Sequence, residues 1–287
     1  MANITAAQVK ELRELTSAGM MECKKALTES NGDIQGAVEW LRRNGAAKAE
    51  KKAGRSTSEG RVGVLISDDG KKAAMVELLC ETDFVARNEK FQELLNDLCK
   101  QTVAANSVFE GEMPSDMAGK VEAQVKEVVG VLGENMKAGR VCRFEVAEGE
   151  GRIRAYVHHD GKQAAMVEVA CKSAAVAADA KFVELLDNLC KQVVAMDPKY
   201  VSSASVPEDI VKHELDGYVK AAIESGKPAE KAQMIAQGQV KKFLAGQCLL
   251  EQEYVLGDKE TVADMVKAAS KALGEELTVK RFYRVKI

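Results

Sequence analysis

Hydrophobic residues recur at every second position in two regions of the chain, which is the spacing of a β-strand with one buried face. In the first region, Val62, Val64 and Ile66 are followed by the polar turn Ser67–Gly70 and the apolar run Ala74–Cys80. An Asp-Gly pair between two apolar runs is a strong signal for a β-hairpin. The pattern therefore predicts two antiparallel strands joined by a tight turn.

A helical spacing follows this hairpin. Apolar residues recur at steps of three and four, at Phe91, Leu94, Leu95 and Leu98. This spacing predicts a helix that begins near Asn88. The segment between hairpin and helix, Thr82–Val85, is expected to be a connecting loop.

The whole unit is present twice. Residues 60–101 and 151–192 align without a gap at a constant offset of 91, and 22 of 42 positions are identical. The first copy carries Thr82-Asp83-Phe84 where the second carries Ser173-Ala174-Ala175. Because the second copy makes the same connection with two alanines, the fold does not require the carboxylate or the aromatic ring. We interpret Phe84 as an exposed anchor for a partner, since loops on rigid scaffolds commonly carry function.

A structural role for these two side chains is the alternative. Phe84 could fill a local gap, and Asp83 could cap the helix that follows.

Residues 1–52 have the pattern of a small three-helix unit. Thr5 is a candidate N-cap for the first helix, a second helix is predicted over Met20–Thr28, and Asp33 begins a third. We expect Asn44-Gly45 to end the third helix, and residues 46–59 to form a helical tail that runs into a linker.

Three further segments complete the expected fold. Lys120–Met136 is expected to be helical, Val141–Ala147 to be a strand, and Arg281–Ile287 to be a closing strand. Residues 208–243 are expected to form a helical hairpin whose turn contains Gly226 and Pro228. Two hairpins backed by helices predict an α+β fold with antiparallel sheets.

Composition limits the possible functions. The chain has 287 residues, 46% apolar and 30% charged, which is enough for two or three domains with real cores. A net charge of −3 and an aromatic content of 5% give no reason to expect nucleic-acid binding. No apolar run is long enough to cross a membrane. The N-terminus shows no signal or Arg-rich transit pattern, so we expect a cytoplasmic protein.

Chemistry-bearing motifs are scarce. The seven cysteines are odd in number, form no C-x-x-C pair and lie mostly in apolar runs, so we expect buried, reduced thiols. The three histidines have no metal-ligand spacing, and no phosphate-binding or nucleophile motif occurs. We therefore expect no catalytic residues, no cofactor and no metal site. An acid/base enzyme on the duplicated core remains a less favoured alternative.

Two segments carry a resemblance to a known family. The first is Leu12-Arg13-Glu14-Leu15-Thr16-Ser17-Ala18-Gly19-Met20-Met21-Glu22-Cys23-Lys24-Lys25-Ala26-Leu27, and the second is Cys80-Glu81-Thr82-Asp83-Phe84-Val85-Ala86-Arg87-Asn88. Weaker matches are Gly133-Glu134-Asn135-Met136, Tyr156-Val157-His158 and Ser225-Gly226-Lys227-Pro228. On these residues the chain resembles bacterial elongation factor Ts proteins, the guanine-nucleotide exchange factors for the GTPase elongation factor Tu.

The resemblance implies an architecture and a role. It implies a ubiquitin-associated-like docking domain over residues 1–52, core halves over 53–139 and 140–287, and a helical hairpin over 207–244 inserted in the second half. It implies a translation elongation factor, not an enzyme, that promotes GDP release from elongation factor Tu by disturbing its magnesium and phosphate site. The hairpin could either form a homodimer or contact the partner, and the sequence does not decide between these two roles.

The resemblance also implies which residues bind the partner. Thr82, Asp83, Phe84 and Val85 would act near the partner's magnesium site. Arg13, Met20 and Met21 would contact its nucleotide domain, and His158 would belong to a separate contact. From helix patterns alone, two adjacent methionines at a helix start are more often core residues than interface residues, although adjacent residues point in different directions and one of them could be exposed.

The chain departs from the family pattern in two places, and the second removes any partner contact that the further segment makes in relatives. Leu79 stands where relatives usually carry a small polar residue, and the chain stops at Ile287 without a further helical segment found in some relatives. The alternative function is a non-catalytic adaptor whose N-terminal unit binds helices or ubiquitin-like folds. That alternative does not explain the Asp-Phe difference between the copies.

Overall fold

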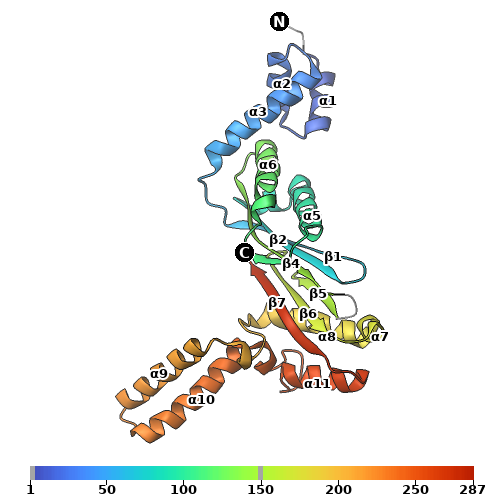
Figure 1. The fold of residues 1–287 in the computed structure, drawn as a ribbon. Helices are drawn as coiled ribbons and strands as arrows, with labels where there is room; N and C mark the ends of the chain where they lie inside the picture. Colours follow the sequence, from blue (N-terminus) through green and yellow to red (C-terminus); the bar gives the residue numbers. More distant parts are fainter. Residues whose placement is uncertain (1–3, 148–150) are drawn as a thin grey trace.

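The computed structural model describes residues 4–147 and 151–287 and combines helices with antiparallel sheets, as the sequence predicts (Figure 1). Over these residues the first sheet has the strand order β1-β2-β4-β3 and the second has the order β5-β6-β7. All pairs are antiparallel. The strands of the first sheet are β1 (Glu59–Ile66), β2 (Lys72–Cys80), β3 (Phe109–Gly111) and β4 (Met136–Glu145). Those of the second are β5 (Arg152–Val157), β6 (Gln163–Ala170) and β7 (Thr278–Lys286).

The helices are arranged around these sheets. An N-terminal unit contains α1 (Ala6–Thr16), α2 (Met20–Glu29) and α3 (Ile34–Lys52). In the first half of the core, α4 (Asp83–Ala86) and α5 (Glu89–Val103) connect β2 to β3, and α6 (Ser115–Leu132) connects β3 to β4. In the second half, α7 (Ala174–Ala178), α8 (Ala180–Met196) and α11 (Val262–Leu273) lie between β6 and β7. A hairpin of α9 (Glu208–Glu224) and α10 (Ala229–Gln247) extends away from the second sheet (Figure 1). Short 3-10 turns occur at Ser203–Ser205 and Leu249–Glu251.

The core follows from the alternation of side chains along the strands. Val76 and Leu78 of β2 face α5 and α6, whereas Met75 faces the other sheet. The inner faces of the sheets pack together through Met75 and Phe144 on one side and Met166 on the other. Helices α8 and α11 cover the outer face of the second sheet. The result is a sandwich of two sheets with helices on both outer faces, visible in Figure 1.

The two copies contact each other reciprocally. The amide of Val62 donates to the carbonyl of Gly161, and the amide of Ile153 donates to the carbonyl of Gly70, both at 2.8 Å. Val62 is equivalent to Ile153 in the repeat, and Gly70 is equivalent to Gly161. Reciprocal contacts between equivalent positions are what two-fold symmetry produces, so the copies are related by an approximate two-fold axis.

The repeat extends beyond the segment that the sequence reveals. Gly133-Glu134 before β4 corresponds to Gly274-Glu275 before β7, and both glycines end a helix in the left-handed conformation, with φ of 81° and 69°. The offset is 141 here because the helical hairpin is inserted in the second copy. Strands β4 and β7 therefore belong to the repeat, although the gap-free alignment of residues 60–101 with 151–192 does not include them.

Matching ion pairs support this correspondence. Glu77 pairs with Arg140 at 2.6 Å, and Glu168 pairs with Arg281 at 2.7 Å. Both glutamates are buried and lie at a register shift in the central strand of their sheet. An irregular strand exposes backbone groups that the ladder does not pair, and Arg140 donates its own amide to Glu77 at 2.8 Å.

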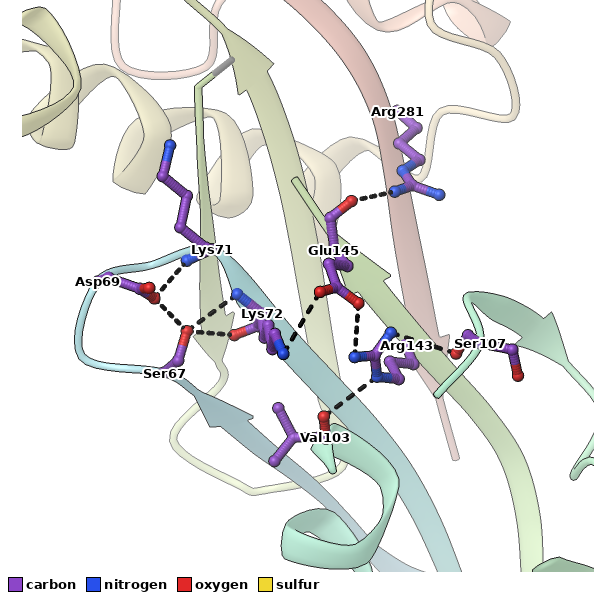
Figure 2. Close-up of polar contacts among 9 residues, drawn as sticks. All are labelled: Ser67, Asp69, Lys71, Lys72, Val103, Ser107, Arg143, Glu145 and Arg281. Atoms are coloured by element: carbon purple, nitrogen blue, oxygen red, sulfur yellow. Dashed lines mark hydrogen bonds and ion pairs between the residues drawn. The ribbon is translucent and has the colours of Figure 1, made fainter. Parts of the chain in front are cut away.

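A buried arginine closes the end of α5 (Figure 2). Arg143 donates to the carbonyls of Val103 at 3.1 Å and Ser107 at 3.2 Å, and it pairs with Glu145 at 2.7 Å. Lys72 pairs with the same carboxylate at 3.4 Å. The last carbonyls of a helix lack partners within the helix, so Arg143 satisfies groups that would otherwise be buried unpaired.

Two expected helix ends are wrong. Helix α3 does not stop at Asn44-Gly45 but continues to Lys52, so the helical tail expected after residue 45 is the continuation of the same helix. Gly45 instead faces Gly130 of α6, where an added Cβ on Gly130 would lie 2.7 Å from the Cα of Gly45. This glycine marks a close helix crossing rather than a helix end.

The helix predicted over Lys120–Met136 ends four residues early, at Leu132. Gly133 terminates it, and Met136 is the first residue of β4. The predicted hairpin over 208–243 is confirmed, and its two arms meet along Ala222, Ala232 and Val240. Helix α11 has no counterpart among the expected elements.

Candidate functional site

Phe84 lies on a one-turn helix rather than on the expected loop. Helix α4 begins after Thr82, whose hydroxyl accepts a hydrogen bond from the amide of Val85. The Phe84 side chain is 82% exposed, so the interpretation that it fills a local gap is wrong. The helix that follows is capped by Asn88, which accepts from the amide of Lys90, and not by Asp83.

Several contacts hold this turn from the protein side. The amide and hydroxyl of Thr82 donate to the carboxylate of Glu134, at 3.0 and 2.8 Å. The thiol of Cys80 donates to the carbonyl of Thr82 at 3.1 Å, and Gln92 donates to the carbonyl of Ala86 at 2.5 Å. Phe84 is therefore an exposed ring on a turn whose backbone is fixed at both ends.

The charged groups around the Phe84 turn interact with near neighbours on or beside the turn. Asp83 pairs with Arg87 at 2.9 Å, a partly exposed i,i+4 pair that orients both side chains on the surface. Burial, together with the nearby charge of Glu134, raises the pKa of the Cys80 thiol to about 11. Cys80 thus remains a neutral hydrogen-bond donor beneath the turn at physiological pH.

The second copy provides a built-in comparison. Ser173 caps α7 as Thr82 caps α4, and it accepts from the amide of Val176 at 3.1 Å. Ala175, the equivalent of Phe84, is exposed. Both turns begin with the same kind of hydroxyl cap, and only one of them presents an aromatic ring.

The three other residues on the N-terminal unit are exposed. Arg13 lies on α1, and Met20 and Met21 begin α2 with 60% and 74% of their side chains exposed. Neither methionine is a core residue. Leu15 is also exposed, so this end of the unit presents several apolar side chains to solvent.

His158 lies at the turn between β5 and β6. Its Nδ1 is 3.2 Å from the hydroxyl of Tyr156, and its ring lies 4.2 Å from that of His159 between centroids. The structure thus places the candidate residues on three separate units: the N-terminal helices, the first sheet layer and the second sheet. A single small-molecule site does not bring them together.

The described residues contain neither a metal-binding cluster nor a membrane-spanning helix. Between residues 4 and 147 and between 151 and 287, no group of three or more His, Cys, Asp and Glu side chains is placed to hold a metal ion. Across the same ranges, every helix is too short or too polar to cross a bilayer.

Comparison with known proteins identifies the family. A model of the family described as Elongation factor TS matches residues 81–287. An elongation factor Ts from Nitratidesulfovibrio vulgaris is 47% identical over 99% of this chain and 96% of its own length. Those from Desulfovibrio desulfuricans and Symbiobacterium thermophilum are 43% and 42% identical, over 100% and 99% of this chain and 99% and 92% of their own lengths.

The chain belongs to the elongation factor Ts family. The resemblance drawn from the two sequence segments is therefore confirmed. The helix-binding adaptor gains no support from these matches to elongation factor Ts.

Sequence reasoning did not connect Glu134 with the turn that carries Phe84. Its contact with Thr82 spans 52 residues of sequence, and no local pattern predicts it. A signal exists nonetheless: Leu-Gly-Glu followed by Arg-x-x-Arg occurs at 132–143 and again at 273–284. Aligning those segments shows that Glu134 and Glu275 occupy equivalent positions, although it does not show that they contact the two turns.

Proposed function

We propose that this protein binds the GTPase elongation factor Tu and promotes release of GDP, so that GTP can rebind. Membership of the elongation factor Ts family over nearly the whole chain carries this proposal. The exposed, braced Phe84 supports it, because it has the form of an anchor for a protein partner. The protein acts as a binding factor in translation elongation and not as an enzyme with its own active site.

The partner's magnesium ion offers a physical mechanism. GTPases hold nucleotide through phosphate-loop amides, a lysine and Mg²⁺. Mg²⁺ requires nearly ideal octahedral geometry, so a small displacement of its surroundings weakens nucleotide binding. Thr82, Asp83, Phe84 and Val85 would produce that displacement by inserting the ring beside the magnesium site.

Energetics require more than this one contact. Accelerating release by about 10⁴ needs a barrier lowered by about 5.5 kcal/mol. Burying one aromatic side chain contributes roughly 1.5–3 kcal/mol. Arg13, Met20, Met21 and His158 therefore supply additional contacts. The first three are exposed and His158 is half-buried, and their placement on separate units suits a partner that spans the molecule.

Coupling between nucleotide and factor is reciprocal. The factor binds the empty GTPase more tightly than the nucleotide-loaded GTPase. The ratio by which nucleotide lowers the affinity for the factor therefore equals the ratio by which the factor lowers the affinity for nucleotide. GTP rebinding then releases the factor for another cycle.

The finer organisation also belongs to this proposal. Residues 1–52 form a ubiquitin-associated-like docking domain, residues 53–139 and 140–287 the two core halves, and residues 207–244 an inserted hairpin. The compact three-helix core around Leu12, Cys23 and Leu27 supports the first assignment. Exposed Ile223 and Met234 support a homodimer through the hairpin. We place the protein in the cytoplasm, bound to neither nucleic acid nor membrane.

Release of labelled GDP from elongation factor Tu tests the function. We expect fast release with the wild-type protein, and release slowed about 10- to 100-fold by Phe84→Ala at saturating factor, because burying one ring accounts for about 1.5–3 kcal/mol. Complex formation with nucleotide-free partner should largely persist, since the other contacts remain.

A matched control uses the second copy. The double substitution Ala174→Asp, Ala175→Phe, made in the Phe84→Ala protein, recreates the Asp-Phe pair on the equivalent turn. It should not restore exchange, because the two turns face different parts of the partner. No acceleration by the wild-type protein would refute the proposed function, and full activity of Phe84→Ala would refute the role of the ring.

A further inference from the structure

Glu134 contacts the Phe84 turn but lies far from it in sequence. It follows Gly133, which ends α6, and precedes β4. Its two carboxylate oxygens accept from the two donors of Thr82: Oε2 from the amide at 3.0 Å and Oε1 from the hydroxyl at 2.8 Å. Both donors at the start of α4 are thus satisfied by one side chain.

This contact decides the orientation of the capping hydroxyl. A threonine hydroxyl has one proton and two lone pairs. Because the Thr82 proton points to Glu134, a lone pair is available for the amide of Val85, 3.4 Å away. Helix α4 has only four residues, and the amides of Ala86 and Arg87 donate to the carbonyls of Thr82 and Asp83 at 3.2 Å. So short a helix is marginal by itself, and the cap adds a substantial share of its hydrogen bonding. The conformation of the turn that carries Phe84 therefore depends on its cap.

A second carboxylate makes the reverse contact. Glu81, which precedes Thr82, accepts from the amide of Asn135 at 2.6 Å. Each of the two segments thus sends a glutamate to a backbone amide of the other. The side chain of Asn135 donates to the carbonyl of Arg55 at 2.8 Å, which attaches the linker from α3 to the same place.

The second copy shows which part of this arrangement is scaffold. Glu275, equivalent to Glu134, accepts from the amides of Lys172 and Ser173 through one oxygen. The carboxylate contact to the backbone is common to both copies. Among the described residues, a carboxylate contacts the capping hydroxyl only in the first copy, where Thr82 donates to Glu134 and the turn presents an aromatic ring.

We propose that Glu134 is a positioning residue for nucleotide exchange, which holds the Phe84 turn in the orientation that the partner requires. This inference rests on the proposed function, in which Phe84 acts on the GTPase. An anchor that is already oriented loses less conformational freedom on binding and reaches its target in the productive geometry. Removing the brace should therefore reduce the maximal exchange rate while the ring itself is still present.

Glu134→Gln and Glu275→Gln form a matched pair for the test. Each keeps the size of the side chain and removes a carboxylate from the equivalent place in one copy. We expect the rate of labelled GDP release at saturating factor to fall about tenfold with Glu134→Gln, which corresponds to about 1.4 kcal/mol. The half-saturating concentration should change less than about threefold, and Glu275→Gln should exchange at the wild-type rate.

Combination with Phe84→Ala separates positioning from general stability. If Glu134 acts through Phe84, Glu134→Gln should cause no further fall in a Phe84→Ala protein. Glu134→Asp, which keeps the charge but shortens the reach, should behave like Glu134→Gln and replaces it if the amide variant does not fold. Thermal unfolding of each variant checks that the fold is retained.

Each other outcome overturns the inference. Wild-type exchange by Glu134→Gln, an equal loss with Glu275→Gln, or an undiminished loss in the Phe84→Ala protein would show that Glu134 is scaffold only. The proposed function would survive all three. A wild-type protein that fails to accelerate GDP release would refute both.

Discussion

Single residues in equivalent positions of the two copies show what the fold requires. Glu77 and Glu168 are both kept, both buried and both paired with an arginine, so this pair belongs to the scaffold. Phe84 and Ala175 occupy equivalent exposed positions with different chemistry. A side chain that one copy lacks, while the turn keeps the same kind of N-terminal cap, is free to serve a function.

Arg143 is the buried residue for which we expect a large effect on stability. Arg143→Met keeps the length of the side chain but leaves the carbonyls of Val103 and Ser107 without their donor. We expect a loss of about 2–4 kcal/mol in the free energy of unfolding, measured by urea denaturation.

Lys72→Met provides the control, since Lys72 is a half-exposed partner of the same Glu145 carboxylate. It should cost less than about 1 kcal/mol, as surface ion pairs usually do. Equal losses for the two variants would show that the carbonyl contacts of Arg143 are unimportant.

At the scale of elements, the crossing of α3 and α6 connects the N-terminal unit to the core. The two helices approach closely because Gly45 and Gly130 face each other without side chains. Lys52, the last residue of α3, also donates to the carbonyl of Gly133. The position of the exposed Arg13, Met20 and Met21 relative to the core therefore depends on this crossing.

Gly130→Ala tests the crossing. Its Cβ would lie 2.7 Å from the Cα of Gly45, a backbone atom that can move only if the helices separate. We expect destabilisation of about 1–3 kcal/mol and faster tryptic cleavage in the linker that follows Lys52.

Gly119→Ala on the same helix is the control, because nothing lies within 4 Å of the added Cβ. Alanine is a better helix former than glycine, so this variant should be more stable by about 0.5–1 kcal/mol. Resistance of Gly130→Ala to trypsin equal to that of the wild type would contradict the role of the crossing.

For the whole molecule, the layered core buries the thiols. Among residues 4–147 and 151–287, all seven cysteines are free and buried, as the sequence predicts. Burial raises the pKa of Cys80 and Cys248 to about 11 and that of Cys99 to about 12, from an ordinary value of 9.0. Between a pH of about 9 and these raised values, the thiols ionise in the unfolded chain but stay protonated in the folded protein.

This shift makes stability fall at alkaline pH. Above a pH of about 9 the unfolded thiols lose protons that the folded thiols retain, so the unfolded state is favoured as the pH rises. The stability that the neutral buried thiols contribute is fully present below a pH of about 9. It is lost as the pH rises through the pKa values of the folded thiols, about 11 for Cys80 and about 12 for Cys99. We expect urea midpoints to decline over this range.

Cys99→Val removes one of these thiols and should reduce the decline. Constant midpoints up to a pH of about 11, or rapid alkylation of the folded protein near neutral pH, would contradict the prediction.

The sequence alone determined the parts of this protein that depend on local spacing. The hairpins, helices α5 and α8 and the helical hairpin all follow from apolar periods of two or of three and four, because a period selects which face is buried. The comparison of the copies also predicted that Phe84 is exposed, since an alanine at the equivalent position shows that no core contact is needed.

Only the tertiary structure decided the contacts between distant segments. The sequence predicts a helix end at Gly45, whereas in the structure this glycine lies inside a helix, at the point where that helix crosses α6 next to Gly130. The sequence predicts a loop at Phe84, whereas the structure has a helical turn there. Glu134, 52 residues from Thr82 in sequence, holds this turn by accepting hydrogen bonds from the amide and the hydroxyl of Thr82. A local pattern records which face of an element is buried, whereas the partner on that face is chosen by the packing of the whole chain.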